Sequence, residues 1–371
     1  MSDHQAFIFW GNAETKFFYE LSPDHILTAI EKLKIKTTGR LQALNSMENR
    51  VYDFDIDTKS FYLLTEIPDI KQLVVKFYRP GRWSKEQILE EHDFLLQLEE
   101  SEIPVIAPLN ISGETLFLDT STGLYYALFL KKGGRAPDEF SLFQMETIGR
   151  TLARIHQVGA EKIFQYRLGL HLDQFIKSNA HFLIHENKNN PIPSYLVESF
   201  TIIFNKIYEC SKKIIQIHEE QTPSRLIRLH GDCHFGNIIY RPTYHGESFD
   251  ALNGEEQTLY HFLDFDDSIN GWAVWDIWPL IRTQDEYGQN QLQSLIKGYE
   301  DIRPFPYQEL KLIEIFRTMK MINYYTWIAK RFDDPAFKAA FGFYDASDFW
   351  DQRLQDFKNQ LELIQEIEIF N

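Results

Sequence analysis

The sequence predicts an α+β fold with two lobes: an N-lobe built from an antiparallel sheet and one long helix, and a mainly helical C-lobe. The chain has 371 residues, 44% of them hydrophobic, which suits two hydrophobic cores better than one. Short apolar runs typical of strands dominate up to residue 130, and longer segments with helical period follow. Between them, residues 131–137 (KKGGRAP) form the clearest breaker cluster in the chain. We therefore expect an N-lobe of residues 1–131 and a C-lobe of residues 132–371.

The composition argues against several classes of protein. A net charge of −16 and a pI of about 5.2 do not suit a nucleic-acid or anionic-membrane surface, because clustered Lys and Arg bind both. The two cysteines cannot form a disulfide framework, and no apolar run has the length needed to span a bilayer. The first residues lack the basic and apolar regions of a secretory leader. We expect a cytoplasmic, monomeric protein that binds neither nucleic acid nor membranes.

The N-lobe is expected to begin with a helix, because Ser22 can cap it and Pro23 can take its first position. Residues 1–20 show no clear period and are left unassigned, whereas residues 41–55 and 59–65 look like strands joined by turns. Within the first of these stretches, the small polar residues around Ser46 mark a turn. Its backbone N–H groups and the Ser46 hydroxyl could contact phosphates, although an ordinary hairpin is the favoured explanation of this stretch.

A candidate ion pair follows in the next two elements. Residues 73–78 alternate as a strand and carry Lys76 in the middle, where it either finds a partner or extends to solvent from a sheet edge. Residues 84–100 have helical period, and Glu91 falls within about 60° of the centre of the apolar stripe, whereas Glu90 points away. We therefore predict a Lys76–Glu91 pair of the kind that holds a lysine on nucleotide phosphates. The alternative is a solvated Glu91 at the edge of the stripe.

The remaining elements are expected from the same patterns. They are strands at 116–118 and 124–130 and helices at 145–157, 201–219 and 309–331. The aromatic side chains of the last helix, Tyr324 and Trp327 among them, are expected to pack in a core rather than to bind a ligand. Residues 241–259 are rich in Gly, Ser, Asn and Glu, which predicts a polar surface insertion.

The chemistry is concentrated in residues 229–239 and 261–267. Asp232 is followed by Asn237 and then by Asp264, each beside a short apolar run that predicts a strand. Phosphoryl transfer needs a carboxylate that accepts a hydroxyl proton, and an amide with a second carboxylate that holds Mg²⁺ against nucleotide phosphates. We assign Asp232 as the base and Asn237 with Asp264 as the catalytic metal pair. Asp and Asn are also ordinary turn residues, which is the structural alternative.

Two histidines raise a competing chemistry. His230, Asp232 and His234 alternate, and imidazole with carboxylate can bind Zn²⁺ or a two-metal hydrolase centre. Such centres usually need further His or Asp clusters, and only the aspartates of residues 264–267 follow here. We expect His230 instead to brace the loop through a backbone hydrogen bond.

Two more residues of this region invite structural interpretations. Asp276 stands among apolar residues, where a carboxylate is costly unless it is hydrogen-bonded, so we expect it to brace the catalytic loop through backbone N–H groups. Cys233 directly follows the predicted base. It either senses oxidants or fills space as a small buried residue, and the second interpretation is the better one.

Taken together, Lys76, Glu91 and the runs at 230–237 (HGDCHFGN) and 263–267 (LDFDD) resemble the kinases of the aminoglycoside/choline phosphotransferase superfamily. Within it, the chain looks most like the stress-response Ser/Thr protein kinases of bacteria. This closer resemblance rests on residues 44–52, 75–80, 88–92, 228–234 and 334–337. It covers most of the chain outside the first twenty residues and the 241–259 insertion.

The resemblance implies a bilobal protein-kinase-like fold, ATP and Mg²⁺, and phosphorylation of protein Ser/Thr in a stress-protective role. By matching position, Asp232 would accept the proton, Asn237 and Asp264 would bind magnesium, and Ser46 would contact nucleotide phosphate. Asp264 is followed by Phe-Asp-Asp rather than Phe-Gly, so an activation segment of the usual kind is in doubt. A kinase of a small hydroxyl- or amine-bearing metabolite would use the same residues. A non-catalytic nucleotide-binding scaffold is disfavoured, because the expected catalytic residues are present.

Overall fold

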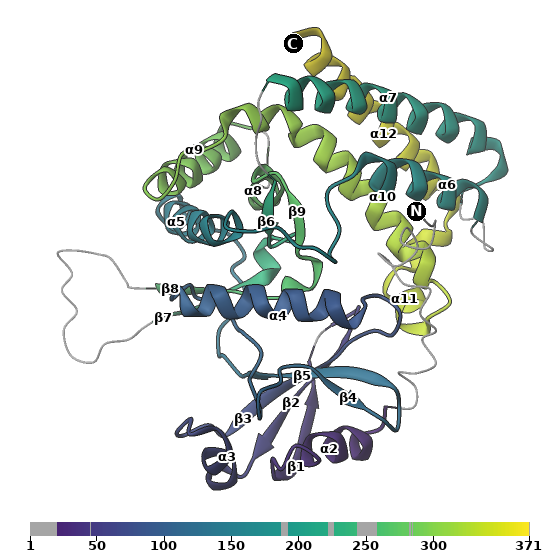
Figure 1. Ribbon diagram of the computed structural model, residues 1–371. Helices are drawn as coiled ribbons and strands as arrows, with labels where there is room; N and C mark the ends of the chain where they lie inside the picture. Colours follow the sequence, from purple (N-terminus) through teal and green to yellow (C-terminus); the bar gives the residue numbers. More distant parts are fainter. Residues whose placement is uncertain are drawn as a thin grey trace.

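The computed structural model describes residues 21–44, 46–186, 192–221, 226–242, 258–281, 283 and 285–370. Figure 1 shows a twisted sheet at one end of the molecule, a helical part at the other, and helix α4 lying across the middle between them. The predicted α+β architecture is thereby confirmed. The unassigned residues 1–20 and most of the predicted 241–259 insertion lie outside the described residues.

The described residues of the N-terminal part form one five-stranded sheet and three helices. In chain order they are α2 (Pro23–Glu31), β1 (Thr37–Ala43), β2 (Arg50–Ile56), α3 (Thr58–Thr65), β3 (Gln72–Phe77), α4 (Lys85–Glu100), β4 (Phe117–Asp119) and β5 (Leu124–Leu130). The strand order is β1-β2-β3-β5-β4, with every neighbouring pair antiparallel. In β3, Lys76 pairs with Val51 on one side and Ala127 on the other. Lys76 therefore lies in the interior of the sheet and not on an exposed edge.

One predicted strand is wrong, because residues 59–65 form helix α3 (Thr58–Thr65). The aromatic residues Phe61 and Tyr62 favour a strand by propensity. However, the Asp57 side chain accepts the Ser60 N–H at 2.7 Å and caps a helix, and only Phe61 of this helix is buried. The helix ends at Glu66, which adopts a left-handed backbone with φ of 61°. Local capping and the burial of a single side chain thus outweigh strand propensity.

Capping explains the other two helices of this part. The Ser22 side chain accepts the His25 N–H, and Pro23 occupies the first turn of α2, as predicted. Helix α4 begins with a full capping box, in which Ser84 and Gln87 each bond the backbone of the other. One face of the sheet packs on α2 and α3 through side chains such as Val75. The opposite face turns Lys76 towards α4.

The C-terminal part is mainly helical. Its α-helices are α5 (Leu142–Gly159), α6 (Asn179–His181), α7 (Val197–Gln221), α8 (Val274–Ile277), α9 (Glu286–Glu300), α10 (Ile313–Arg331), α11 (Pro335–Ala340) and α12 (Ser347–Phe370). Its short strands are β6 (Ile227–Leu229), β7 (Ile238–Pro242), β8 (Thr258–Phe262) and β9 (Ile269–Gly271). Two π-helical segments, η1 (Asp173–Ser178) and η2 (Phe182–Glu186), flank α6. Short 3₁₀ segments are η3 (Ser194–Leu196), η4 (Phe235–Asn237), η5 (Phe265–Asp267), η6 (Trp278–Leu280), η7 (Tyr307–Leu312) and η8 (Gly342–Asp345).

Two small antiparallel sheets, β6-β9 and β7-β8, position the loops of interest between the helices. Helices α5 and α9 pack unusually closely beside them. A Cβ atom at Gly149 would lie 2.1 Å from the carbonyl oxygen of Leu295, and one at Gly298 would lie 1.9 Å from that of Glu146. The two helices can approach this closely only because both positions are glycine.

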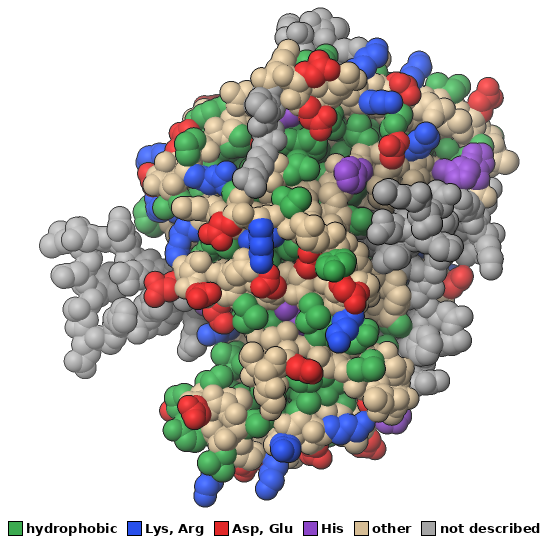
Figure 2. Space-filling view, in the orientation of Figure 1, with side chains coloured by type: hydrophobic (Ala, Val, Ile, Leu, Met, Phe, Trp, Pro, Cys, Tyr) green, Lys and Arg blue, Asp and Glu red, His purple; other side chains and the backbone are tan. Residues whose placement is uncertain are grey.

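The surface carries charges of both signs. On the face shown in Figure 2, Asp and Glu side chains are interspersed with Lys and Arg over the described residues. No helix in the described part of the chain combines the length and the apolar character that a membrane crossing requires.

Candidate active site

The loop of residues 230–237 joins β6 to β7, and the side chain of Asp276 in α8 holds its first residues in place. The two carboxylate oxygens of Asp276 accept the backbone N–H groups of His230 at 2.7 Å and Gly231 at 2.8 Å. His230 in turn bonds the carbonyl oxygen of Leu263 through Nε2 at 2.8 Å. Both predicted bracing roles are confirmed, and the loop is tied to the segment that carries Asp264.

Gly231 brings the same two segments into direct contact. Its φ is +86°, and a Cβ atom there would lie 1.9 Å from the carbonyl oxygen of Asp267. A side chain would therefore meet both a steric clash and an unfavourable backbone conformation.

Asp232 is a partly buried carboxylate with one strongly bound oxygen. Its Oδ1 lies 2.5 Å from the Lys320 ammonium of α10, and its Oδ2 lies 3.4 Å from His234 Nε2. Burial favours the neutral acid, but Lys320 and His234 hold the pKa of the Asp232 carboxyl well below its usual range. Asp232 is therefore ionised at neutral pH, as a proton acceptor must be.

Asn237 and Asp264 reach the same cavity from two neighbouring segments. The Asn237 amide donates to the Asp232 carbonyl oxygen at 2.9 Å, which leaves the amide oxygen for another partner. Asp264 has a left-handed backbone with φ of 57° and ψ of 66°, and its side chain is 56% exposed. This conformation is uncommon for a non-glycine residue, although Asp adopts it more readily than most. Both side chains line one cavity with oxygen atoms, the donor type that Mg²⁺ prefers.

Lys76 lies among three carboxylates. Its ammonium is 3.6 Å from Glu91, 3.1 Å from Asp266 and 3.5 Å from Asp264. The predicted Lys76–Glu91 pair is confirmed, and Glu91 is buried and also binds Arg167 at 3.0 Å. Burial opposes the lysine charge, but Asp266 and Glu91 raise the pKa of Lys76 well above its usual value. The lysine is therefore a fixed cation at the back of the cavity.

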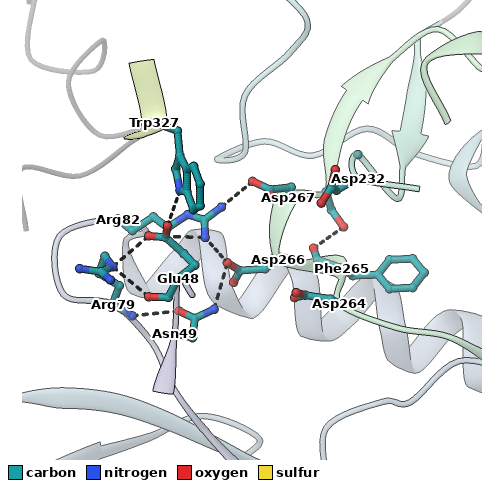
Figure 3. Close-up of polar contacts among 12 residues, drawn as sticks. Glu48, Asn49, Arg79, Arg82, Asp232, Asp264, Phe265, Asp266, Asp267 and Trp327 are labelled. Atoms are coloured by element: carbon teal, nitrogen blue, oxygen red, sulfur yellow. Dashed lines mark hydrogen bonds and ion pairs between the residues drawn. The ribbon is translucent and has the colours of Figure 1, made fainter. Parts of the chain in front are cut away.

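A buried network around Glu48 joins the two parts of the molecule (Figure 3). Glu48 lies on the turn between β1 and β2 and accepts hydrogen bonds from Arg331 and Trp327 of α10, both at 2.7 Å. Arg79 pairs with it from the N-terminal part at 3.1 Å. Burial alone would raise the pKa of Glu48, but Arg331, Arg82 and Arg79 lower it to about 2. The Glu48 carboxylate is thus ionised, and its ion pair and hydrogen bond connect the sheet to helix α10.

Arg82 extends this network to the residues after Asp264. Its guanidinium contacts Asp266 at 2.6 Å and Asp267 at 2.5 Å, and Asn49 donates to Asp266 at 3.2 Å. Figure 3 shows these groups converging from the turn and from η5. The Phe-Asp-Asp run that departs from ordinary protein kinases therefore supplies the partners of Arg82 and Lys76. Ser46 lies on the same turn and lines the cavity.

The cavity between the two parts has a volume of about 1210 Å³. We call its side formed by η1, α8, η6 and α10 the aromatic wall. This wall consists of Phe175, Trp275, Trp278, Arg317, Lys320, Met321, Asn323, Tyr324, Tyr325 and Trp327. No residue of the wall is acidic. Both Tyr324 and Trp327 contact neighbouring rings, but Tyr324 is 41% exposed, so its predicted core position is wrong. Both residues also line the cavity, and Trp327 binds Glu48.

The competing interpretations of this region find no support. Both ring nitrogens of His230 are engaged, because Nε2 bonds Leu263 and Nδ1 accepts the Asp232 N–H at 3.3 Å, so neither is available to a zinc ion. Cys233 is 1% exposed in the core, and burial raises the pKa of its thiol well above the usual value. Its surroundings therefore fit the predicted packing role and not that of a reactive thiol.

Sequence reasoning missed Lys320, Glu48 and Arg82. Lys320 has the helical spacing of Arg317, Tyr324 and Trp327, so its face of α10 was predictable. Its approach to Asp232 was not, because 88 residues separate the two. Glu48 and Trp327 are 279 residues apart, and no local pattern connects them.

Comparisons with known proteins agree with this geometry. Residues 45–313 match the family model "APH: Phosphotransferase enzyme family". The chain is 34% identical over 349 residues to "Stress response kinase A" of Escherichia coli (strain K12), covering 94% of this chain and 95% of that protein. It is 34% identical over 353 residues to "Serine/threonine protein kinase RdoA" of Salmonella typhimurium (strain LT2), with 94% and 95% coverage. The structure of an amicoumacin kinase complex aligns with a TM-score of 0.66 at 18% identity, covering 95% of this chain and 96% of that one.

Proposed function

Because the chain belongs to the phosphotransferase enzyme family, we propose that it transfers the γ-phosphoryl group of ATP to a Ser or Thr hydroxyl of a protein. One observation carries the proposal: Asp232, Asn237, Asp264 and Lys76 line a single cavity. A cytoplasmic location, a monomeric state and a lobe boundary at residues 131/132 stay predictions.

Asp232 would orient the acceptor hydroxyl and take its proton. Its Oδ1 is bound by Lys320, so Oδ2 would face the acceptor. In phosphoryl transfer the protein contributes mainly positioning and charge stabilisation, so an ionised and well-held carboxylate is sufficient.

Lys76 would contact the nucleotide phosphates, held in place by Glu91 and Asp266. The Ser46 turn would cover the phosphates with its backbone N–H groups. Asn237 and Asp264 would hold a Mg²⁺ ion, which neutralises phosphate charge when it is bound. Their amide and carboxylate oxygens on one cavity fit this ion.

The aromatic wall favours a protein acceptor over a cationic metabolite. Arg317 lies 5.0 Å from the Trp278 ring and Lys320 lies 5.5 Å from the Trp275 ring. The protein's own cations therefore already lie over two of the wall's aromatic rings, where an ammonium group would otherwise bind. A cationic aminoglycoside or choline would also meet two like charges at the wall itself, and the acidic residue nearest to the wall, Asp232, is already paired with Lys320. The name of one relative of 34% identity, serine/threonine protein kinase RdoA of Salmonella typhimurium, points to the same acceptor class.

The test is a transfer assay with purified protein, Mg²⁺ and γ-labelled ATP. Dephosphorylated casein and the protein itself serve as protein acceptors, and choline and kanamycin serve as metabolite acceptors. We expect label in phosphoserine or phosphothreonine after hydrolysis of the protein, and none in the metabolites. Label found only in a metabolite would reject the protein kinase and favour a kinase of small molecules.

A further inference from the structure

Helix α10 (Ile313–Arg331) presents a polar and aromatic face to the cavity. Arg317, Lys320, Tyr324 and Trp327 recur at spacings of three, four and three residues, so they lie along one side of the helix. The opposite side is fixed in the core by side chains such as Ile322. The backbone that carries Lys320 is therefore rigid.

Three contacts hold the Lys320 ammonium at the predicted base. It lies 2.5 Å from Asp232 Oδ1 and 3.4 Å from the Gly231 carbonyl oxygen, and it is 5.5 Å from the centre of the Trp275 ring. The lysine side chain is 29% exposed, so the charged pair is screened only in part by solvent.

We infer that Lys320 is a positioning residue for phosphoryl transfer, which acts by holding the Asp232 carboxylate with Oδ1 bound and Oδ2 directed at the acceptor hydroxyl. This inference rests on the proposed function. Oδ2 lies 3.4 Å from His234 Nε2 and 3.5 Å from Asn237 Nδ2, and both distances are too long for strong hydrogen bonds. Oδ2 is thus the oxygen that remains able to accept a proton.

The positive charge of Lys320 should also reduce electrostatic repulsion in the cavity. Asp232, Asp264, Asp266 and Asp267 all line this cavity, and an anionic phosphoryl group must approach them during the reaction. Lys76 and Arg82 offset the last three from the N-terminal part. Lys320 is the cation in contact with Asp232, and it reduces the repulsion between this carboxylate and the incoming phosphoryl group.

A merely structural lysine would give a different set of kinetic effects. If Lys320 only stabilised the fold, its loss would lower the amount of active enzyme but not the turnover of each folded molecule. If it acts through Asp232, its loss should lower kcat with little change in the affinity for ATP–Mg²⁺. The loss should also vanish once the Asp232 carboxylate has been removed.

The experiment compares Lys320→Met, Lys320→Arg, Asp232→Asn and the double variant Asp232→Asn/Lys320→Met. Lys330→Met, ten residues further along the same helix, is the control. Single-turnover transfer from labelled ATP–Mg²⁺ is measured to casein and to water, together with nucleotide binding and thermal unfolding. We expect kcat to fall about 10²-fold in Lys320→Met, the size of effect that a 1 Å misplacement produces. Lys320→Arg should recover part of the loss, and the double variant should match Asp232→Asn.

The outcomes separate this inference from the proposed function. Equal kcat in Lys320→Met and wild type would overturn the inference alone. Losses that multiply in the double variant would overturn it too, because Lys320 would then act independently of Asp232. If Lys320→Met does not fold, the test depends on Lys320→Arg, which keeps the positive charge. A Lys320→Arg variant that folds and binds nucleotide normally but has no transfer activity would contradict the inferred role of the Lys320 charge. A wild type that transfers phosphoryl to neither casein nor water would contradict the proposed function itself.

Discussion

At Asp232, one carboxylate oxygen is bound and the other is left open. Lys320 holds Oδ1 at 2.5 Å, and the contacts of Oδ2 are 3.4 Å or longer. The carboxylate stays ionised although it is partly buried, because Lys320 and His234 lower its pKa. A single side chain can thus be both oriented and basic.

The first prediction concerns the base. Asp232→Asn keeps the shape of the side chain and removes its ability to accept a proton. Positioned general-base catalysis typically contributes about 10²–10⁴ in rate, so transfer should fall by this factor while ATP–Mg²⁺ binding persists. Single-turnover kinetics and a nucleotide titration measure the two effects, with the exposed Asp348→Asn as control. Undiminished turnover would remove Asp232 from the mechanism.

The second prediction concerns the metal pair. Asp264→Asn is the sharper variant, because Asn tolerates the left-handed backbone at φ of 57° nearly as well as Asp, whereas Ala does not. Loss of the carboxylate charge should abolish the tightening of nucleotide binding by Mg²⁺ and, with it, phosphoryl transfer, without lowering the unfolding temperature. Titrations of ADP with and without Mg²⁺ measure the effect of the metal on nucleotide affinity. Equal Mg²⁺-dependent affinities in variant and wild type would exclude Asp264 as a ligand.

At the scale of elements, prediction from sequence succeeded where the signal is local. The capped start of α2 at Ser22, the inward Glu91 of α4 and the strand around Lys76 all follow from periodicity and capping. Residues 59–65 were misassigned, because aromatic strand propensity is a weaker determinant than the Asp57 cap of α3. The contacts of Glu48 and Lys320 depend on tertiary packing between distant elements, which no local pattern encodes.

The third prediction concerns the contact between α5 and α9. Gly298→Ala gains about 1 kcal/mol in helix propensity, but the added methyl would lie 1.9 Å from the Glu146 carbonyl oxygen. Overpacking of this kind typically costs about 1–3 kcal/mol, so the variant should be less stable. Urea unfolding measures the change. Gly133→Ala, outside the helices, controls for the added methyl group alone, because a Cβ atom there meets nothing within 4 Å. Stabilisation of Gly298→Ala would show that the helices can separate at little cost.

At the scale of the whole molecule, the Glu48 network makes the two parts one unit. The turn between β1 and β2 carries Glu48 and Asn49, which reach α10 and η5 across the cavity. The segment expected to contact nucleotide phosphates is therefore held by the C-terminal part even without nucleotide. Opening the cavity requires the ion pairs of Glu48 with Arg331 and of Arg82 with Asp266 to separate.

The fourth prediction is a pH dependence of stability that arises from this network. The pKa of Glu48 is lowered from 4.5 to about 2 in the folded protein, against the effect of burial, by Arg331, Arg82 and Arg79. A lowered carboxyl pKa contributes stability above the unfolded pKa, and this contribution is lost as the pH falls towards the folded pKa. A shift of this size corresponds to roughly 3 kcal/mol, to be lost between about pH 4.5 and pH 2.

Glu48→Gln isolates this contribution from that of the other carboxyl groups. At neutral pH the variant should be less stable than wild type by roughly 3 kcal/mol, because the buried arginines Arg79, Arg82 and Arg331 each lose one carboxylate partner. The difference in the free energy of unfolding should stay constant above about pH 5 and shrink as the pH falls, because the wild-type carboxylate then becomes protonated. Urea unfolding at a series of pH values measures it, and the exposed Glu99→Gln of α4 controls for the substitution itself. If the difference in the free energy of unfolding between wild type and Glu48→Gln keeps its full size down to pH 2, the charge of Glu48 does not stabilise the contact between the two parts.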